Sequence, residues 1–138
     1  MPELWHEIEL SPAFHDLDPM DIVWHGNYVK YLEIARNALM ARFDYDYPQM
    51  RRSGYAWPIV DMRLKYVEML PYGRRVMVRA EIVEWENRLK VEYVIRDAVT
   101  GQVIHKAHTI QVAFNIAKWE MEYVCPNVLR EKLGVAPE

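Results

Sequence analysis

The sequence contains one cysteine, Cys125, and only two serines, Ser11 and Ser53. A single cysteine excludes an internal disulfide and a zinc site built from several cysteines, and a reducing, cytoplasmic location is the default expectation. Neither serine lies in a Gly-x-Ser-x-Gly sequence, so a Ser-His-Asp hydrolase is a poor interpretation. Cys125 is followed by Pro126 with no histidine nearby, and we interpret this thiol as inert.

Glycine, long apolar runs and a strong charge imbalance are also lacking. Five glycines occur in 138 residues, and they form neither a Gly-x-Gly-x-x-Gly nor a Walker-type phosphate loop. No apolar run approaches the roughly 18 residues that span a bilayer, and the acidic, aromatic start does not resemble a signal peptide. The net charge of -3 gives no general attraction to nucleic acid. We expect one domain over residues 1–138 that binds neither membrane nor nucleic acid.

Large, soft apolar side chains are abundant instead. The sequence has five Trp, nine Tyr and eight Met, and hydrophobic residues make up 51% of it. Such residues suit a subunit interface or an apolar ligand pocket, although any single one of them is as well explained as part of the core.

One long helix is predicted after residue 27. Asn27 is a plausible N-cap. The apolar positions that follow recur at steps of three and four, which is the spacing of one helix face, at Tyr28, Tyr31, Leu32, Ala35, Leu39 and Phe43. Residues 15–26, before this helix, are expected to form a loop, and residues 44–56, after it, a polar connection.

Alternation of apolar and polar residues predicts strands in the rest of the chain. The expected strands are 4–14, 60–66, 76–82, 89–95 and 102–116, and a short helix is expected over 127–133, ended by Gly134. Short turns between the last four strands predict an antiparallel meander. The fold class is therefore α+β, with one helix on an antiparallel sheet. Because one helix leaves sheet edges uncovered, we expect a homodimer or a homotetramer.

The segment 16–28 is the most informative part of the sequence. It places three aspartates and His25 directly before the predicted helix. A helix start offers free backbone N–H groups and the positive end of the helix dipole. A carboxylate held near such a tip can act as base or nucleophile on a carbonyl that those N–H groups polarise. This combination predicts chemistry on an acyl group.

Three stretches resemble the hotdog-fold acyl-CoA thioesterases, and most closely their 4-hydroxybenzoyl-CoA thioesterase-like branch. The first runs from Asp-Leu-Asp-Pro at residues 16–19 to Tyr-Leu-Glu at 31–33, the second is Pro-Ile-Val at 58–60, and the third is Glu-Trp at 84–85 before a basic turn. The first stretch is specific, and together with the element order the resemblance covers residues 5–116. It implies the hotdog fold, with one long central helix on a five-stranded antiparallel sheet.

The resemblance also implies a site. The family's catalytic aspartate falls on Asp18, and its carbonyl-polarising backbone N–H falls near His25, whose ring is a secondary candidate for a proton carrier. Asp21 stands where the family commonly has Gly. It adds a negative charge beside Asp18 and could block the loop if this position needs a positive φ. The implied substrate contacts are Asp21, Val23, Trp24, Asn27, Arg88 and Lys90.

Several of these residues have a simpler interpretation. Asp16 is most simply a loop residue, Asn27 only a cap, and Arg88 and Lys90 either face coenzyme A phosphates or lie on a solvated strand face, as do Arg74 and Arg75. His105 and His108 are three apart on a strand and point to opposite faces, so we predict no metal site.

The implied function is hydrolysis of acyl-CoA, with coenzyme A as part of the substrate and no other cofactor. The alternatives are a thioesterase for acyl groups on an acyl carrier protein, and an acyl-binding hotdog module without catalysis. Trp24, Trp57 and several tyrosines could line an aromatic acyl pocket or form core, and the sequence does not name the acyl group.

Overall fold

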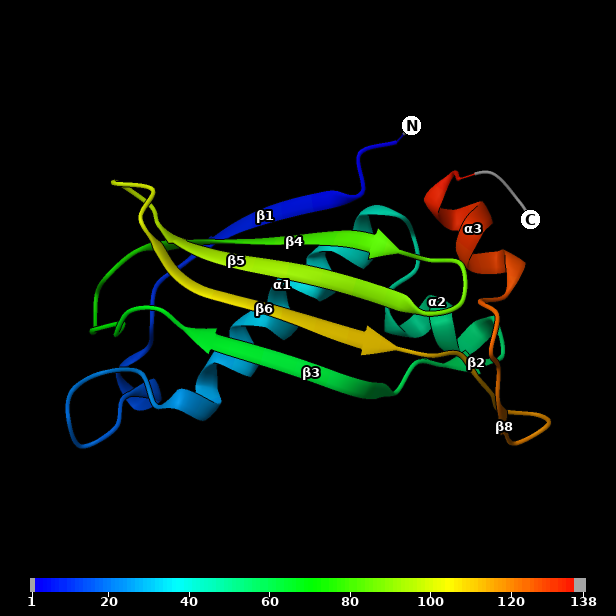
Figure 1. Ribbon diagram of the computed structural model, residues 1–138, viewed down its shortest axis with the longest axis horizontal. Helices are drawn as coiled ribbons and strands as arrows, with labels where there is room; N and C mark the ends of the chain where they lie inside the picture. Colours follow the sequence, from blue (N-terminus) through cyan, green and yellow to red (C-terminus); the bar gives the residue numbers. More distant parts are fainter. Residues whose placement is uncertain (1, 136–138) are drawn as a thin grey trace.

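The computed structural model describes residues 2–135, in which a five-stranded antiparallel sheet curves along one long helix (Figure 1). The strand order is β1-β4-β5-β6-β3. The strands are β1 (Trp5–Leu10), β3 (Ile59–Tyr66), β4 (Val76–Glu84), β5 (Leu89–Asp97) and β6 (Val103–Gln111). The α+β class and the five-stranded antiparallel sheet predicted from the sequence are thus confirmed.

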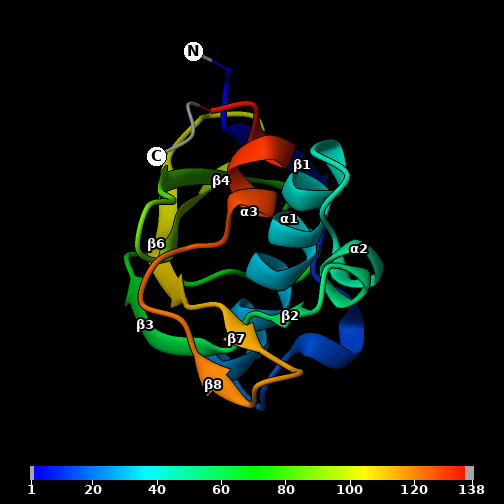
Figure 2. The same cartoon turned by 90° about the vertical axis from the view of Figure 1, so that its right-hand side faces the viewer.

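Helix α1 (Tyr28–Arg42) packs against the sheet, which encloses it along one side (Figure 2). Its closest strand neighbours are β4 and β1. The predicted apolar face is confirmed at five positions, since Tyr28, Tyr31, Leu32, Ala35 and Leu39 are buried. Phe43, also predicted on this face, follows the end of the helix and is half-buried, and Met40 is buried in addition. Burying this face against the sheet is the main reason why the segment is helical, since isolated helices of this length are marginal in water.

The central strands β4 and β5 supply the other side of the core. Alternate residues of both strands are buried, as predicted, namely Val76, Val78, Ala80, Ile82, Leu89, Val91, Tyr93 and Ile95. Each fully buried aliphatic side chain of this kind contributes about 1.5–3 kcal/mol relative to an exposed one. The period-two pattern therefore fixes which face of these strands meets α1.

The predicted four-strand meander is wrong in the position of its first strand, β3. β3 pairs with β6 and not with β4, whose other neighbour is β1. The link over residues 67–75 includes a turn at Pro71–Gly73, but it is longer than a hairpin loop and carries the chain across the sheet. β3 is consequently an edge strand, and three apolar residues of its alternating pattern, Val60, Met62 and Tyr66, are exposed.

Other boundaries also differ from expectation. The predicted first strand shortens to β1, and the predicted strand over 102–116 breaks after β6. Its end pairs instead in a small sheet of β2 (Tyr55–Ala56), β7 (Phe114–Asn115) and β8 (Glu120–Met121). Helix α2 (Tyr47–Arg52) lies in what was expected to be a connection, and Asp46 and Gln49 form a capping box at its start. Helix α3 (Asn127–Leu133), ended by Gly134 at φ 71°, is as predicted.

Two features bear on the kind of protein this is. None of the helices within residues 2–135 has both the length and the apolar character needed to cross a membrane. The Cys125 side chain is buried, and this burial raises the pKa of its thiol to about 12. A thiol held protonated in this way is a poor nucleophile, which agrees with the interpretation of Cys125 as inert.

Candidate active site

The loop before α1 is folded tightly on itself. The Asp18 N–H donates to the Ile22 carbonyl oxygen at 2.8 Å, and the Asp21 N–H donates to the Asp18 carbonyl oxygen at 3.0 Å. Asp21 closes this loop with φ 62°, in the left-handed region. Aspartate is one of the few residue types other than glycine that adopt this conformation. The substitution of Asp for the family's usual Gly therefore does not block the loop, and the Asp21 side chain is exposed.

Asp16 ties this loop to α1. Its carboxylate is 2% exposed and accepts hydrogen bonds from the Tyr31 hydroxyl (2.7 Å), the Ala13 N–H (3.1 Å) and the Lys30 ammonium group. Burial raises the pKa of the carboxyl group, but the hydrogen bonds from Lys30, Tyr31 and Ala13 outweigh burial and lower this pKa to about 2. Asp16 is thus a buried structural carboxylate, not the simple loop residue that the sequence suggested.

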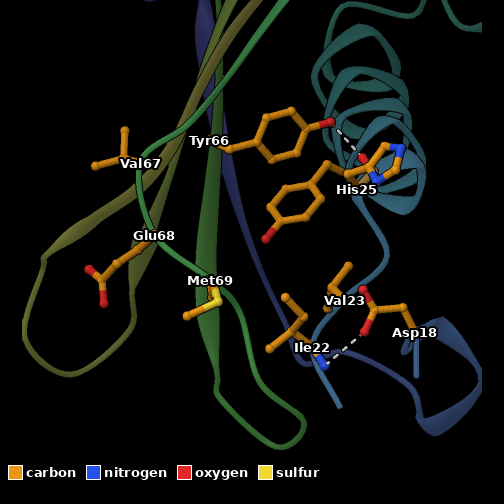
Figure 3. A pocket seen from close by; sticks show the side chains of 9 residues that line it. Asp18, Ile22, Val23, His25, Tyr66, Val67, Glu68 and Met69 are labelled. Atoms are coloured by element: carbon orange, nitrogen blue, oxygen red, sulfur yellow. Dashed lines mark hydrogen bonds between the residues drawn. The ribbon is translucent and has the colours of Figure 1, made fainter. Parts of the chain in front are cut away.

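Asp18 lies on a cavity of about 300 Å³ at the start of α1 (Figure 3). One carboxylate oxygen, Oδ1, accepts from the Met20 N–H at 2.8 Å and the Ile22 N–H at 3.4 Å. These backbone donors hold the side chain through Oδ1 alone, as the dashed line to Ile22 shows for one of them (Figure 3). The cavity is lined by Asp18, Ile22, Val23, His25, Tyr28, Tyr66, Val67, Glu68 and Met69.

The tip of the helix lies on the same cavity. A 3-10 turn, η2 (His25–Asn27), precedes α1, and Trp24 before it has extended backbone angles. The Trp24 and Asn27 N–H groups are used by the carbonyl oxygens of Asp16 and Trp24. Within residues 2–135, the N–H groups of His25 and Gly26 have no acceptor. Two unpaired donors at a helix tip beside a carboxylate form the arrangement that the sequence predicted.

Asn27 has a different role from the predicted one. It has helical backbone angles, and its side chain makes no capping hydrogen bond. The Asn27 Nδ2 group instead donates to the Asp16 carbonyl oxygen at 2.8 Å, which fastens the loop to the helix start. The prediction of Asn27 as N-cap side chain is wrong because the 3-10 turn moves the beginning of the helical segment to His25.

Val23 and Trp24, directly before the tip, differ in their surroundings. Val23 is 3% exposed and its N–H donates to the Leu70 carbonyl oxygen at 2.8 Å. The Trp24 ring is half exposed and lies 5.0 Å from the His25 ring, centroid to centroid. It also covers Gly26 so closely that an added Cβ there would lie 2.2 Å from the indole, which explains the glycine at this position.

An aromatic wall behind the cavity was not foreseen. The rings of Tyr28, Tyr66 and His105 pack against one another. Their centroids are 4.9 Å apart for Tyr28 and Tyr66, 4.7 Å for Tyr28 and His105, and 4.8 Å for Tyr66 and His105. The Tyr66 hydroxyl donates to the His25 carbonyl oxygen at 2.6 Å (Figure 3). Burial lowers the pKa of His105 to about 4, so its imidazole is neutral at pH 7. The alternation of β3 could have indicated Tyr66 only as a core residue, because His25, which its hydroxyl contacts, is 41 residues away in sequence.

The basic residues expected at coenzyme A do not join this cavity. The turn between β4 and β5, which carries Arg88, lies at the opposite end of the sheet from the loop before α1 (Figure 1). Arg88 Nε donates to Glu84 Oε2 at 3.0 Å, and Lys90 follows on β5. Arg74 pairs with Asp97 at 2.8 Å. Within one chain, the structure therefore brings Asp18 and His25 together but not Arg88 and Lys90.

A second, larger hollow of about 1000 Å³ lies between α1, α2 and the small sheet. Its walls carry many of the aromatic and methionine residues noted in the sequence, among them Met40, Met50, Trp57, Phe114, Trp119 and Met121. We call this hollow the apolar groove. It begins at Trp57 and Pro58, directly before β3, whereas the Asp18 cavity includes Tyr66 and Val67 at the other end of the same strand.

Comparison with known proteins gives the family. The model of the thioesterase-like superfamily matches residues 12–133, which is most of the sequence. The chain belongs to this superfamily. It is 32% identical over 85 residues to a candidate acyl-CoA thioesterase of Bacillus subtilis, a match that covers 62% of this chain and 61% of the relative. It is 26% identical over 138 residues to a candidate esterase of Synechocystis, covering 95% of this chain and 80% of that protein.

The solved structures agree on the fold. A variant of 4-hydroxybenzoyl-CoA thioesterase, crystallised with 4-hydroxybenzoyl-CoA, superimposes with a TM-score of 0.81 at 19% identity, over 94% of this chain and 99% of that one. The fold of this chain is thus the hotdog fold, and its family makes it a thioester hydrolase. Both conclusions confirm the resemblance drawn from the three stretches and the element order of the sequence.

Proposed function

We propose that this chain hydrolyses acyl-CoA thioesters to a free acid and coenzyme A, with Asp18 as the catalytic carboxylate. The observation that carries the proposal is the shared cavity, which is lined by Asp18 and by His25 at the helix tip. Within the described residues, the N–H groups of His25 and Gly26 at this tip have no acceptor. Family membership supports the reaction class, and the geometry supports the choice of residues.

In the proposed mechanism, the thioester carbonyl oxygen accepts from the free N–H groups at the tip. Asp18 then either attacks the carbonyl carbon or removes a proton from an attacking water. Direct attack expels the coenzyme A thiolate and leaves a mixed anhydride, which water cleaves to the acid and the regenerated carboxylate. In both routes negative charge grows on the carbonyl oxygen, where loss of one donor typically slows turnover by about 10²–10³-fold.

We propose further that the working unit is at least a homodimer joined at β3. This edge strand exposes apolar side chains, with Val60 50% and Met62 38% exposed. If β3 of one protomer pairs antiparallel with β3 of its partner about a two-fold axis, the start of each strand lies beside the end of the other. The partner's apolar groove then adjoins the Asp18 cavity and supplies a large apolar acyl site. A Val60→Lys variant should sediment as a monomer and lose activity, whereas an unchanged oligomer would argue against this interface.

Acyl groups on a carrier protein are the alternative substrate. Carrier proteins are acidic, and a basic surface around the cavity mouth would favour them. Within residues 2–135, the cavity lining includes the acidic Asp18 and Glu68 and forms no such basic surface. Because coenzyme A is anionic as well, our preference for coenzyme A esters rests on the likeness to the candidate acyl-CoA thioesterase of Bacillus subtilis.

The test is thiol release by the wild-type chain from short, long and aromatic acyl-CoA esters, with acyl-carrier-protein esters as competitors. The proposal expects turnover of at least one coenzyme A ester, with a preference for bulky apolar acyl groups. Faster turnover of the carrier-bound esters would favour the alternative substrate. Tight binding of coenzyme A esters with no thiol release would overturn the proposal and leave an acyl-binding module.

A further inference from the structure

The structure ties the tip of α1 to the end of the edge strand through a single side chain. Tyr66 is the last residue of β3, and its hydroxyl donates to the His25 carbonyl oxygen at 2.6 Å. His25 begins the 3-10 turn that carries the unpaired N–H groups of His25 and Gly26. Other hydrogen bonds around the tip belong to the loop that precedes it and run to the Asp16 and Leu70 carbonyl oxygens.

The hydrogen bond from Tyr66 acts on the peptide unit between His25 and Gly26. A peptide unit is planar, and its C=O and N–H groups point in opposite directions. Fixing the carbonyl oxygen of His25 therefore fixes the direction of the Gly26 N–H as well. A donor on the carbonyl also polarises the peptide and strengthens its N–H as a hydrogen-bond donor.

The ring of Tyr66 is itself held in place. It packs edge-on against Tyr28 on α1 and against His105, which is directly opposite on β6. His105 is fully buried, and within the described residues neither of its ring nitrogens has a hydrogen-bond partner. It therefore acts in this wall as a flat aromatic surface, which leaves the Tyr66 hydroxyl directed at the helix tip (Figure 3).

From these contacts we infer that Tyr66 is a positioning residue for catalysis, which holds the N-terminal turn of α1 in the orientation that receives the thioester carbonyl. The inference rests on the proposed function and adds to it a residue outside the loop and helix that carry the chemistry. Tyr66 does not touch the reacting atoms in this account. It acts through the His25–Gly26 peptide.

The test is a Tyr66→Phe variant, which removes only the hydroxyl and keeps the ring in the aromatic wall. We expect kcat to fall by about tenfold with KM within about twofold, because a misdirected donor weakens binding of the transition state more than of the substrate. In an NMR spectrum, the Gly26 amide proton should shift upfield when its peptide loses the donor on the carbonyl.

Tyr93→Phe is the matched control. It also removes one buried hydroxyl, which forms a hydrogen bond with Thr109 at 2.9 Å and interacts with Arg36, but away from the Asp18 cavity. It should change the melting temperature at least as much as Tyr66→Phe while leaving kcat and the Gly26 amide signal unchanged. Equal losses of kcat in the two variants would show a general structural effect and overturn the inference.

The two proposals fail in different ways. If the wild-type chain releases no thiol from any ester, the proposed function fails, and the Gly26 amide signal still decides whether Tyr66 orients the tip. If the wild-type chain is active and Tyr66→Phe retains full kcat with an unmoved amide signal, the proposed function stands and the positioning role is overturned.

Discussion

Asp16 and Asp18 are two residues apart on the same loop, yet their surroundings differ in almost every respect. Asp16 is 2% exposed and receives hydrogen bonds from a lysine, a tyrosine and a backbone N–H. Asp18 is partly exposed on a cavity, and only backbone N–H groups of its own loop bind it. The lone pairs of Asp16 are occupied by the fold, whereas those of Asp18 remain available to a ligand.

This contrast shows how one short segment separates stability from chemistry. A buried carboxylate that already accepts hydrogen bonds from Lys30 and the buried Tyr31 cannot leave them to act as a base without a large loss of stability. A carboxylate held by its own loop can approach a substrate while the loop stays folded. We therefore assign the structural role to Asp16 and the catalytic role to Asp18. A separate variant tests each assignment.

The largest effect is expected from Asp18→Asn. We predict a kcat lower by about 10²–10⁴-fold, the range for loss of a catalytic base, with a free energy of unfolding within about 0.5 kcal/mol of wild type. Stability should survive because the Asn oxygen still accepts from the Met20 and Ile22 N–H groups. Asp44→Asn is the control, since Asp44 is an exposed carboxylate on another loop that pairs with Lys132. A comparable loss of kcat in Asp44→Asn would contradict the assignment of Asp18 as the catalytic carboxylate.

Asp16→Asn should show the opposite pattern. It leaves Lys30 and Tyr31 without their anionic acceptor, and we predict a free energy of unfolding lower by about 2–4 kcal/mol in chemical denaturation. Because Lys30 is half exposed, the loss should lie near the lower end of this range. At a temperature where the variant is fully folded, kcat should remain within a few-fold of wild type. A loss of kcat as large as that of Asp18→Asn would contradict the separation of roles.

The lowered pKa of Asp16 predicts how the free energy of unfolding depends on pH. The pKa of Asp16 falls from 3.8 to about 2 on folding, so the unfolded chain binds a proton more readily than the folded one. The resulting stabilisation, about 2 kcal/mol, is fully present above pH 5 and is lost as the pH falls from 4 through 2. Denaturation measured across this range should give a wild-type curve that converges on that of Asp16→Asn. Parallel curves would show that Asp16 does not carry the difference.

Asp21→Gly should have the smallest effect. Residue 21 has φ 62°, which glycine adopts without strain but which also costs glycine more entropy on folding. We predict a change in the free energy of unfolding of less than about 1 kcal/mol and a kcat within twofold of wild type. Asp21→Ala, which removes the charge but keeps the strain, should be less stable than Asp21→Gly. A large loss of kcat in both variants would give Asp21 a role at the substrate.

The sequence predicted the parts of the structure that local patterns encode. The apolar periodicity of α1, β4 and β5, and the position of Asp18 beside the tip near His25, were all readable because the residues concerned are close in the chain. The neighbours of β3, the fastening roles of Asp16 and Asn27, and the wall of Tyr66 and His105 were not. The strand pairing and the aromatic wall join residues far apart in sequence, and the fastening contacts depend on how the loop folds back on the helix, so apolar periodicity reports none of them.

The most direct measurement is a crystal structure of the Asp18→Asn variant with an acyl-CoA ester that the wild-type chain hydrolyses. The account predicts the thioester carbonyl oxygen about 2.7–3.1 Å from the backbone N–H of His25 or Gly26, with the carbonyl carbon facing residue 18. An acyl-CoA bound with its thioester away from the tip, or with the side chain of residue 18 turned from the carbonyl carbon, would contradict it.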